Sequence, residues 1–206
     1  MRLYDSTIPS GNAYKVHLLL NLLGLQYETT ELDILATPSE TRRPSFLAIN
    51  PNGRIPVLQL DDGSILPESN AILYYLADGT RFLPSARLQR AQVLQWMFFE
   101  QYSHEPYVAV LKFWTYWGGL DNCRPEDIKR WKSRGQAALD VMESHLAGRE
   151  FFVGGFSIAD IALFAYTHGS DAIGFRHGPA LRAWLARVAA QPGHVRIKRD
   201  PTGNAP

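Results

Sequence analysis

The stretch NPNGRIPVLQLDDGSILPESNAI, residues 50–72, decides the fold of this chain. Two short strand-like runs flank an Asp-Asp-Gly turn within residues 57–66, which predicts a β-hairpin. Proline has no N–H to donate to a strand ladder, so Pro56 belongs at a strand's first residue, at an edge or at a bulge. The hairpin therefore has a proline at its entrance and a Glu68-Ser69 pair at its exit, where a helix begins.

The residues around the hairpin alternate between strand and helix patterns. The expected strands and helices are residues 2–5 (strand), 12–23 (helix), 27–34 (strand), 40–48 (short helix) and 69–77 (helix). With the hairpin, the order is β-α-β-α-β-β-α. A right-handed crossover makes the first two strands parallel, and the hairpin adds an antiparallel pair. This half of the chain is predicted to be an α/β domain.

The second half of the chain reads as helix. The pattern breaks at Gly79 and Pro84, which places a domain boundary there and divides the chain into residues 1–78, a linker at 79–86, and an all-helical domain at 87–206. The helical signals are a shared face of Ala91, Leu94 and Phe98, apolar residues stepping by three or four through 128, 131, 135, 138, 142 and 146, and a helix at 180–190. Residues 199–206 are predicted to be an unstructured tail.

The segment Ser157-Ile158-Ala159-Asp160 has the pattern of a helix capping box, with Asp in place of the usual Glu or Gln. We expect the serine hydroxyl and the carboxylate to satisfy backbone N–H groups at the start of a helix in the second domain.

Composition excludes several classes of protein. Hydrophobic residues make up 46% and charged residues 20% of 206 residues, and the net charge is +1, which favours neither nucleic acid nor an anionic membrane as a partner. No apolar run reaches transmembrane length, and an acid at position 5 is too early for a secretory signal peptide. The single cysteine, Cys123, allows no internal disulfide and fits a reducing cytoplasm. The six histidines are scattered, so no metal site is predicted.

The residues at the two ends of the hairpin suit an amino-acid-like ligand. If the peptide bond before Pro56 is cis, the N–H and C=O of Ile55 point outward and can pair with an extended peptide; the alternative is a trans proline that merely starts an edge strand. Ser69 is a natural N-cap, a helix N-terminus binds carboxylates, and Glu68 can hold an ammonium group. The alternative is an ordinary cap beside a solvated glutamate.

Taken together, Asn50-Pro51-Asn52-Gly53-Arg54-Ile55-Pro56-Val57 and Glu68-Ser69-Asn70-Ala71-Ile72 resemble the glutathione site of the glutathione transferase family. The resemblance extends over essentially the whole chain, including Phe156-Ser157-Ile158-Ala159-Asp160, which is similar to the family's buried capping box. It implies a thioredoxin-like N-terminal domain followed by a C-terminal helical bundle.

The resemblance also implies roles for the site residues. Ile55, before a cis Pro56, pairs main chain to main chain with the cysteinyl unit of glutathione. Glu68 and Ser69 take the ammonium and carboxylate of the γ-glutamyl unit. Arg54 pairs with a carboxylate of the tripeptide or is simply solvated.

Glutathione chemistry requires a thiolate, and a free thiol with a pKa near 8.5 is mostly protonated at neutral pH. In this family the donor to sulfur lies at the start of the first helix, which makes Ser10 the first candidate and Asn12 the second. The alternative is that Ser10 or Asn12 is simply the N-cap of the helix, in which case the two residues divide the capping and donor roles. The loop after the first strand does not resemble the tyrosine-type branch, and position 10 is not a cysteine. "PSGNAYKV" differs from the maleylacetoacetate-isomerase branch, and it is similar enough to the disulfide-bond oxidoreductase branch to keep that activity open.

Aromatic residues are concentrated between Trp96 and Trp117. Most are expected in the core or a dimer interface, and a few should line a pocket for an apolar electrophile between the domains. Tyr102, His104 and Tyr107 are the candidates. His104 resembles a histidine that approaches the sulfur in cysteine-type bacterial transferases, although Glu105 replaces the lysine that follows it there; the alternative is a surface histidine.

The resemblance therefore predicts a cytoplasmic, homodimeric glutathione transferase of bacterial type, with a detoxification role and glutathione as co-substrate. A glutathione-dependent isomerase, dehalogenase, peroxidase or disulfide reductase on the same scaffold is the alternative. A non-enzymatic interaction module is the third reading, and the intact ligand residues disfavour it.

Overall fold

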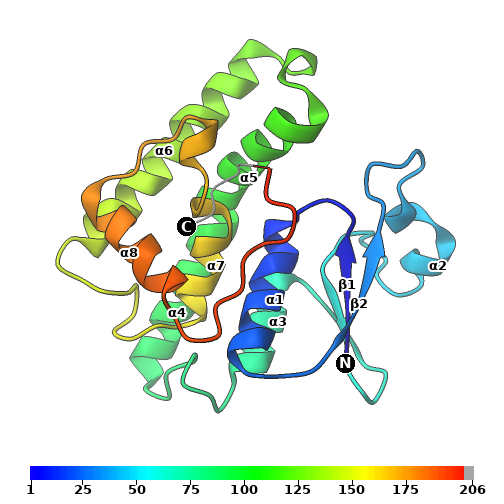
Figure 1. The fold of residues 1–206 in the computed structure, drawn as a ribbon, viewed down its shortest axis with the longest axis horizontal. Helices are drawn as coiled ribbons and strands as arrows, with labels where there is room; N and C mark the ends of the chain where they lie inside the picture. Colours follow the sequence, from blue (N-terminus) through cyan, green and yellow to red (C-terminus); the bar gives the residue numbers. More distant parts are fainter. Residues whose placement is uncertain (202–206) are drawn as a thin grey trace. The chain divides into compact units, whose positions relative to one another are not determined.

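The computed structural model describes residues 1–201 and divides the chain into two compact units (Figure 1). One unit contains residues 1–78 and a C-terminal segment, residues 192–200; the other contains residues 79–191. The division after Asp78 agrees with the break expected from the sequence. The placement of residues 192–200 differs from the sequence-based division, which had assigned them to the helical domain.

The first unit has the element order that the sequence predicts. Its elements are β1 (Arg2–Ser6), α1 (Gly11–Leu22), β2 (Glu28–Leu32), η1 (Glu40–Arg42), α2 (Pro44–Leu47), β3 (Val57–Gln59), β4 (Ile65–Pro67) and α3 (Ser69–Ala77). The strand order is β2-β1-β3-β4, in which β1 and β2 are parallel and the other two pairs are antiparallel. This is the mixed sheet of a thioredoxin-like domain.

Alternate residues of the strands face opposite sides of this sheet, and each side has its own core. Leu3 and Leu58 pack with Val16 and Leu20 of α1 and Ile72 of α3. On the other side, the neighbouring residues of the same strands, Tyr4 and Val57, pack with Phe46 of α2. The helices α1 and α3 therefore cover one face of the sheet, and α2 covers the other.

The C-terminal segment, residues 192–200, is held to the first unit by polar contacts to α1, the β1–α1 loop and β2. The Tyr14 hydroxyl donates to the carbonyl of Val195 at 2.8 Å, and the Arg199 guanidinium donates to the carbonyl of Thr7 at 2.6 Å and lies 3.4 Å from a Glu31 carboxylate oxygen. Of the tail predicted to be unstructured, Arg199 and Asp200 belong to this packed segment, and residues 202–206 lie outside the described residues.

The second unit is helical in the described residues. Its elements are α4 (Arg87–Phe99), η2 (Glu100–His104), α5 (Glu105–Phe113), η3 (Trp114–Gly118), η4 (Leu120–Asn122), α6 (Pro125–Leu146), α7 (Ile158–Thr167), η5 (Asp171–Ile173) and α8 (Pro179–Ala189). The predicted stripe on α6 is confirmed at Gly135, Ala138, Met142 and Leu146, which are all buried. A Cβ at Gly135 would lie 2.6 Å from the Phe175 ring, so a larger residue there would require the ring to move.

The apolar face predicted for α4 is not its buried face. Val93, Trp96 and Met97 are buried, whereas Phe98 is 69% exposed and Ala91 is exposed. Both faces of this helix have apolar residues at helical spacing, so periodicity alone does not distinguish the face that packs from the face that meets solvent.

The capping box at the start of α7 is confirmed. Ser157 is the N-cap residue, its side chain accepts from the backbone N–H of Ala159, and Asp160 accepts from the backbone N–H of Ser157 at 2.9 Å. The same carboxylate accepts from the Phe152 N–H at 3.1 Å and from the Trp184 indole N–H at 2.9 Å. Asp160 thus ties the start of α7 to α8 and to the chain before it.

In the part of the chain that the structure describes, no helix is both long enough and apolar enough to cross a bilayer. Within those same residues, no group of three or more His, Cys, Asp or Glu side chains is gathered closely enough to hold a metal ion.

Candidate functional site

The N-terminus of α1 carries the two residues predicted to face the sulfur. Ser10 is the N-cap residue, and its Oγ accepts from the backbone N–H of Ala13 at 3.3 Å. A hydroxyl that accepts one hydrogen bond still has its own proton to donate. Capping α1 and donating to a ligand are therefore compatible roles for Ser10.

Asn12 is the second residue of α1 and is part of a cluster with Lys15 and Ser69. Its Oδ1 accepts from the Lys15 ammonium at 2.7 Å and from the Ser69 hydroxyl at 3.2 Å. Lys15 Nζ is also 3.5 Å from Ser69 Oγ, and the lysine side chain is fully buried. The cluster joins the N-termini of α1 and α3, so the structure brings one predicted sulfur donor next to one predicted γ-glutamyl ligand. Sequence reasoning did not identify Lys15.

The entrance to β3 has a fixed backbone. The Ile55–Pro56 peptide bond is cis. The Asn50 side chain donates to the carbonyl of Arg54 at 2.8 Å, which holds the loop before Ile55. Pro56 is buried, Ile55 is half-buried, and the Arg54 side chain is exposed and reaches solvent.

The start of α3 differs in one respect from the sequence prediction. Ser69 is not the N-cap residue but the first residue of the helix, and Glu68 occupies the cap position. Because β4 ends at Pro67 and α3 begins at Ser69, Glu68 alone must redirect the chain. It does so at φ 71° and ψ 113°, a conformation that residues with a Cβ rarely adopt. The Glu68 side chain is exposed, and Ser69 is buried.

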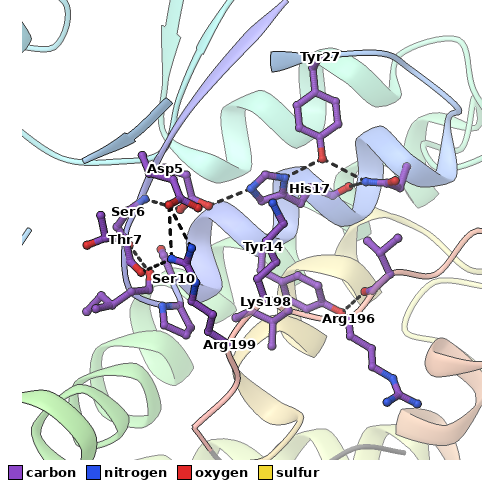
Figure 2. A pocket seen from close by; sticks show the side chains of 16 residues that line it. Asp5, Ser6, Thr7, Ser10, Tyr14, His17, Tyr27, Arg196, Lys198 and Arg199 are labelled. Atoms are coloured by element: carbon purple, nitrogen blue, oxygen red, sulfur yellow. Dashed lines mark hydrogen bonds and ion pairs between the residues drawn. The ribbon is translucent and has the colours of Figure 1, made fainter. Parts of the chain in front are cut away.

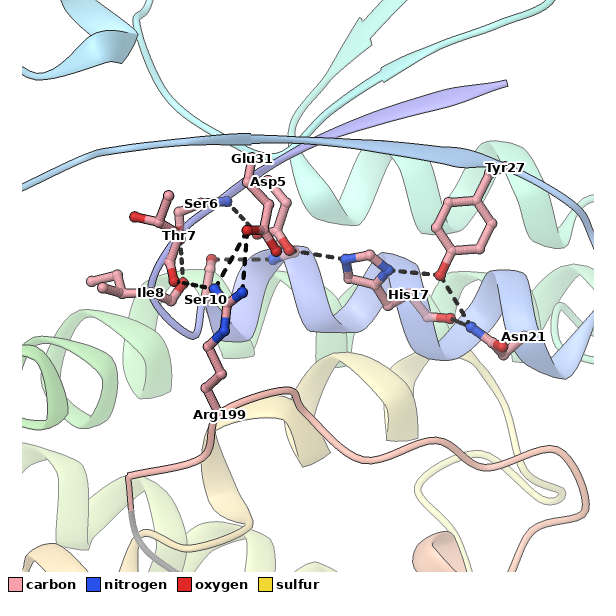
Figure 3. A network of polar contacts seen from close by, with 11 residues as sticks. Asp5, Ser6, Thr7, Ile8, Ser10, His17, Asn21, Tyr27, Glu31 and Arg199 are labelled. Atoms are coloured by element: carbon pink, nitrogen blue, oxygen red, sulfur yellow. Dashed lines mark hydrogen bonds and ion pairs between the residues drawn. The ribbon is translucent and has the colours of Figure 1, made fainter.

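A chain of hydrogen bonds that the sequence analysis did not predict links α1 to β1 and to the start of β2 (Figure 3). The Tyr27 hydroxyl lies 2.7 Å from His17 Nδ1, and His17 Nε2 lies 2.9 Å from Asp5 Oδ2. The other Asp5 oxygen accepts from the Ser6 N–H at 2.6 Å. These contacts fix the end of β1, which leads into the loop that carries Ser10. No local pattern signals them, since the partners are far apart in the sequence.

A cavity of about 220 Å³ lies within the first unit, between α1, the β1–α1 loop and the C-terminal segment (Figure 2). Ser10, Tyr14 and His17 line it from α1 and its cap, and Arg196 and Lys198 line it from the C-terminal segment. Burial raises the pKa of Tyr14, so its phenol stays protonated and donates to Val195.

The three pocket candidates of the helical unit have different surroundings. Tyr102 is 83% exposed, Tyr107 is half-buried, and His104 is fully buried. Thr167 Oγ1 donates to the carbonyl of Leu163 at 2.7 Å, so His104 Nε2, 3.1 Å away, donates to Thr167. The burial of His104 differs from the surface position considered as an alternative. Its part in a substrate pocket, and those of Tyr102 and Tyr107, stay predictions.

Two family profiles match the chain. The profile for the N-terminal domain of glutathione S-transferases matches residues 9–78, and that for the C-terminal domain matches residues 125–187. The first match contains Ser10, Asn12, Glu68 and Ser69, and the second contains the capping box of α7.

Similar proteins cover the chain from end to end. The maleylacetoacetate isomerase of Pseudomonas aeruginosa is 31% identical over 216 residues, which span 100% of this chain and 98% of the relative. The disulfide-bond oxidoreductase YfcG of Escherichia coli is 29% identical over 194 residues, spanning 89% and 88%. Among solved structures, a glutathione S-transferase from Pseudomonas fluorescens superposes with a TM-score of 0.90 at 52% identity, covering 95% of this chain and 97% of that one.

A glutathione transferase from Pseudomonas putida, crystallised with one glutathione disulfide per subunit, has a TM-score of 0.80 at 28% identity and covers 93% of this chain and 87% of that one. With fold, domain profiles and full-length relatives in agreement, the chain belongs to the glutathione S-transferase family.

Proposed function

We propose that this protein is a glutathione transferase, in which glutathione thiolate attacks an apolar electrophile. The observation that carries the proposal is the cluster at the N-termini of α1 and α3, where Asn12 and Ser69 share a hydrogen bond of 3.2 Å. A donor for the sulfur and a ligand for the γ-glutamyl unit are thereby held side by side. Solved relatives with bound glutathione or glutathione disulfide support this choice of co-substrate.

Each part of the tripeptide has a complementary group in the first unit. The exposed Glu68 carboxylate takes the γ-glutamyl ammonium, and Ser69 with the N–H groups of α3 takes its carboxylate. The main chain of Ile55 pairs with the cysteinyl unit, and the exposed Arg54 is available to the glycyl carboxylate.

In the reaction, the protein first favours loss of the thiol proton. Ser10 Oγ–H and the Asn12 amide donate to the sulfur, and the positive end of α1 adds its field, so the bound thiol has a lower pKa than free glutathione. The thiolate then forms a C–S bond with the electrophilic carbon, and the electron pair moves to the leaving group or to an adjacent acceptor atom that takes up a proton. The contribution of the protein is positioning and pKa control.

Disulfide reduction through a glutathione mixed disulfide is the second candidate function. The Asn12 amide at the start of α1 and the similarity to YfcG favour it. Isomerisation, suggested by the Pseudomonas aeruginosa relative, is a third use of the same bound thiolate. All three begin with glutathione on the same residues.

We also infer a symmetric homodimer in the cytoplasm. Exposed apolar side chains on α4 and η2 support self-association, since Leu88 is 71%, Phe98 is 69% and Tyr102 is 83% exposed. The single cysteine, Cys123, fits a reducing compartment.

The test is calorimetric binding of reduced and of oxidised glutathione to the wild-type protein. Tighter binding of the reduced form is expected for a conjugating transferase, and tighter binding of the oxidised form would favour disulfide reduction. If the protein binds neither reduced nor oxidised glutathione, conjugation and disulfide reduction are both contradicted, and the non-enzymatic interaction module remains.

The role of Ser10 has its own test. In Ser10→Ala, the pKa of bound glutathione should rise by about one unit, which corresponds to the loss of one charge-assisted hydrogen bond. Titration of the ultraviolet absorbance of the thiolate measures it. An unchanged pKa would transfer the role to Asn12 or to the backbone of α1.

A further inference from the structure

Lys15 is a charged side chain in the interior of the first unit, and the proposed function assigns it no task. It lies in α1 and is fully buried. An ammonium group removed from water is strongly disfavoured unless polar atoms around it accept its hydrogen bonds. Two of the polar atoms around it are Asn12 Oδ1 at 2.7 Å and Ser69 Oγ at 3.5 Å.

The contact with Lys15 determines which way the Asn12 amide faces. An ammonium group has donors only, and the Ser69 hydroxyl also donates to Asn12. The atom of the amide that faces both must therefore be its oxygen. Because Oδ1 and Nδ2 are bonded to the same planar carbon, an amide whose Oδ1 faces Lys15 directs its Nδ2 away from Lys15. The side chain of Asn12 is thus held as an oriented N–H donor.

The same contacts hold the N-terminus of α1 next to the N-terminus of α3. Asn12 belongs to the first turn of α1, and Ser69 is the first residue of α3. Lys15, one turn further along α1, is within hydrogen-bond reach of both. If Ser69 turns its hydroxyl proton toward a ligand carboxylate, Asn12 Oδ1 keeps the hydrogen bond from Lys15, and the amide keeps its orientation.

We propose that Lys15 is a positioning residue of the glutathione site, which fixes the Asn12 amide so that its N–H points to the sulfur while Ser69 binds the γ-glutamyl carboxylate. The proposal rests on the proposed function, since it requires glutathione at the N-termini of α1 and α3. It assigns the buried ammonium a part in the pKa of the bound thiol without contact to the ligand.

The test is a double-mutant cycle on the full-length protein, with reduced glutathione as the probe. The variants are Lys15→Met, Asn12→Ala and the double variant, and the readout is the pKa of bound glutathione from the ultraviolet absorbance of its thiolate. Lys15→Met should raise this pKa by about one unit in the wild-type background, and by much less in the Asn12→Ala background, because the donor that Lys15 orients is then absent.

Two variants serve as controls. Lys15→Arg keeps the charge and the donors, and should restore most of the wild-type pKa. Lys129→Met makes the same substitution at an exposed lysine of the helical unit and should leave the pKa unchanged. Equal shifts from Lys15→Met in both backgrounds, or no shift in either, would overturn the proposal.

A measurement on the wild-type protein covers the case in which Lys15→Met does not fold. The side-chain amide of Asn12 should be rigid in nuclear magnetic relaxation, in contrast to an exposed amide such as that of Gln95. Equal mobility of the two amides would refute the positioning role. If the wild-type protein binds glutathione but the tests of Lys15 and Asn12 fail, only this inference is refuted. If the wild-type protein does not bind glutathione, the proposed function itself is refuted.

Discussion

The helices α3 and α7 both begin at an acid and a serine, yet the two helix ends are built in opposite ways. At α7 the serine precedes the acid, both are buried, and the Asp160 carboxylate receives hydrogen bonds from Ser157, Phe152 and Trp184. At α3 the acid precedes the serine, and the exposed Glu68 side chain makes no capping hydrogen bond.

The difference shows how residue order separates a structural helix end from one that we propose to bind a ligand. In the order Ser-x-x-Asp, the serine hydroxyl accepts from the N–H of Ala159 in the first turn, and the carboxylate accepts from the N–H of the N-cap residue Ser157. Both side chains are therefore used within the protein. In the order Glu-Ser, the carboxylate sits outside the first turn and cannot reach those N–H groups. The first N–H groups of a helix have no acceptor within the helix, so the N-terminus of α3 suits an anion and the exposed Glu68 side chain suits a cation.

The largest expected effect is on stability, at α7. In Asp160→Ala, four buried donors lose their acceptor, from Ser157 (two), Phe152 and Trp184. Each unsatisfied buried donor costs about 1–3 kcal/mol, so the free energy of unfolding should fall by about 4 kcal/mol or more, measured by urea denaturation. The exposed Asp121→Ala should change it by less than about 0.5 kcal/mol. A loss below about 1 kcal/mol in Asp160→Ala would remove the distinction between the two helix ends.

The second effect is the pH dependence of the same site. Burial raises the pKa of Asp160 to about 6 from its ordinary value of 3.8, against the hydrogen bonds that lower it. Between these values the folded state binds the proton more tightly than the unfolded state. The contribution of Asp160 to stability is therefore full below about pH 4 and is lost as the pH rises through about 6.

The stability gap between wild type and the non-titrating Asp160→Asn should accordingly narrow by about 2–3 kcal/mol from pH 4 to pH 7, since one pKa unit is about 1.4 kcal/mol. Urea denaturation at both pH values measures the gap. A gap that widens with pH would mean that the donors around Asp160 outweigh its burial.

The third effect is on binding, at α3. Glu68→Ala should weaken glutathione binding about tenfold or more, because the ammonium loses its charged partner, while the free energy of unfolding changes by less than about 1 kcal/mol. Glu68→Gln keeps the size of the side chain and should weaken binding to a similar extent. Calorimetry measures both. An affinity retained in either variant would place the γ-glutamyl unit elsewhere.

The smallest effect concerns the backbone of Glu68. Its φ of 71° is open to glycine and strained for a residue with a Cβ. Glu68→Gly and Glu68→Ala both lack the carboxylate, but Glu68→Gly should be more stable by about 1 kcal/mol in urea denaturation. That result would mean that Glu68, the proposed ligand residue, lowers the stability of the protein, whereas the capping box of α7 raises it. Equal stability of the two variants would show that the turn is unstrained.

Local patterns in the sequence predicted a large part of the fold. The element order of the first unit, the break near residue 78, the stripe on α6 and the capping box at Ser157 and Asp160 all follow from periodicity and end signals that act over a few residues. Of the candidate site, Ser10, Asn12 and Ser69 were named, and the structure places Asn12 and Ser69 in one cluster.

The features that the sequence did not reveal depend on contacts between distant residues. Lys15 looks like an ordinary polar position on a helix, and only the approach of Ser69 from α3 shows why it is buried. Glu68 takes the cap position because β4 and α3 leave one residue for the turn. The buried side of α4 was misjudged because apolar residues occur on both of its faces.

The C-terminal segment, residues 192–200, has a consequence for how the protein is made. The ribosome finishes residues 1–78 long before it reaches Val195, whose carbonyl accepts the Tyr14 hydroxyl, and Arg199, which binds the β1–α1 loop. During translation, part of α1 therefore lacks its contacts with residues 192–200 until the helical unit has been synthesised. The loop that carries Ser10 gains its contact with Arg199 only when residues 192–200 emerge.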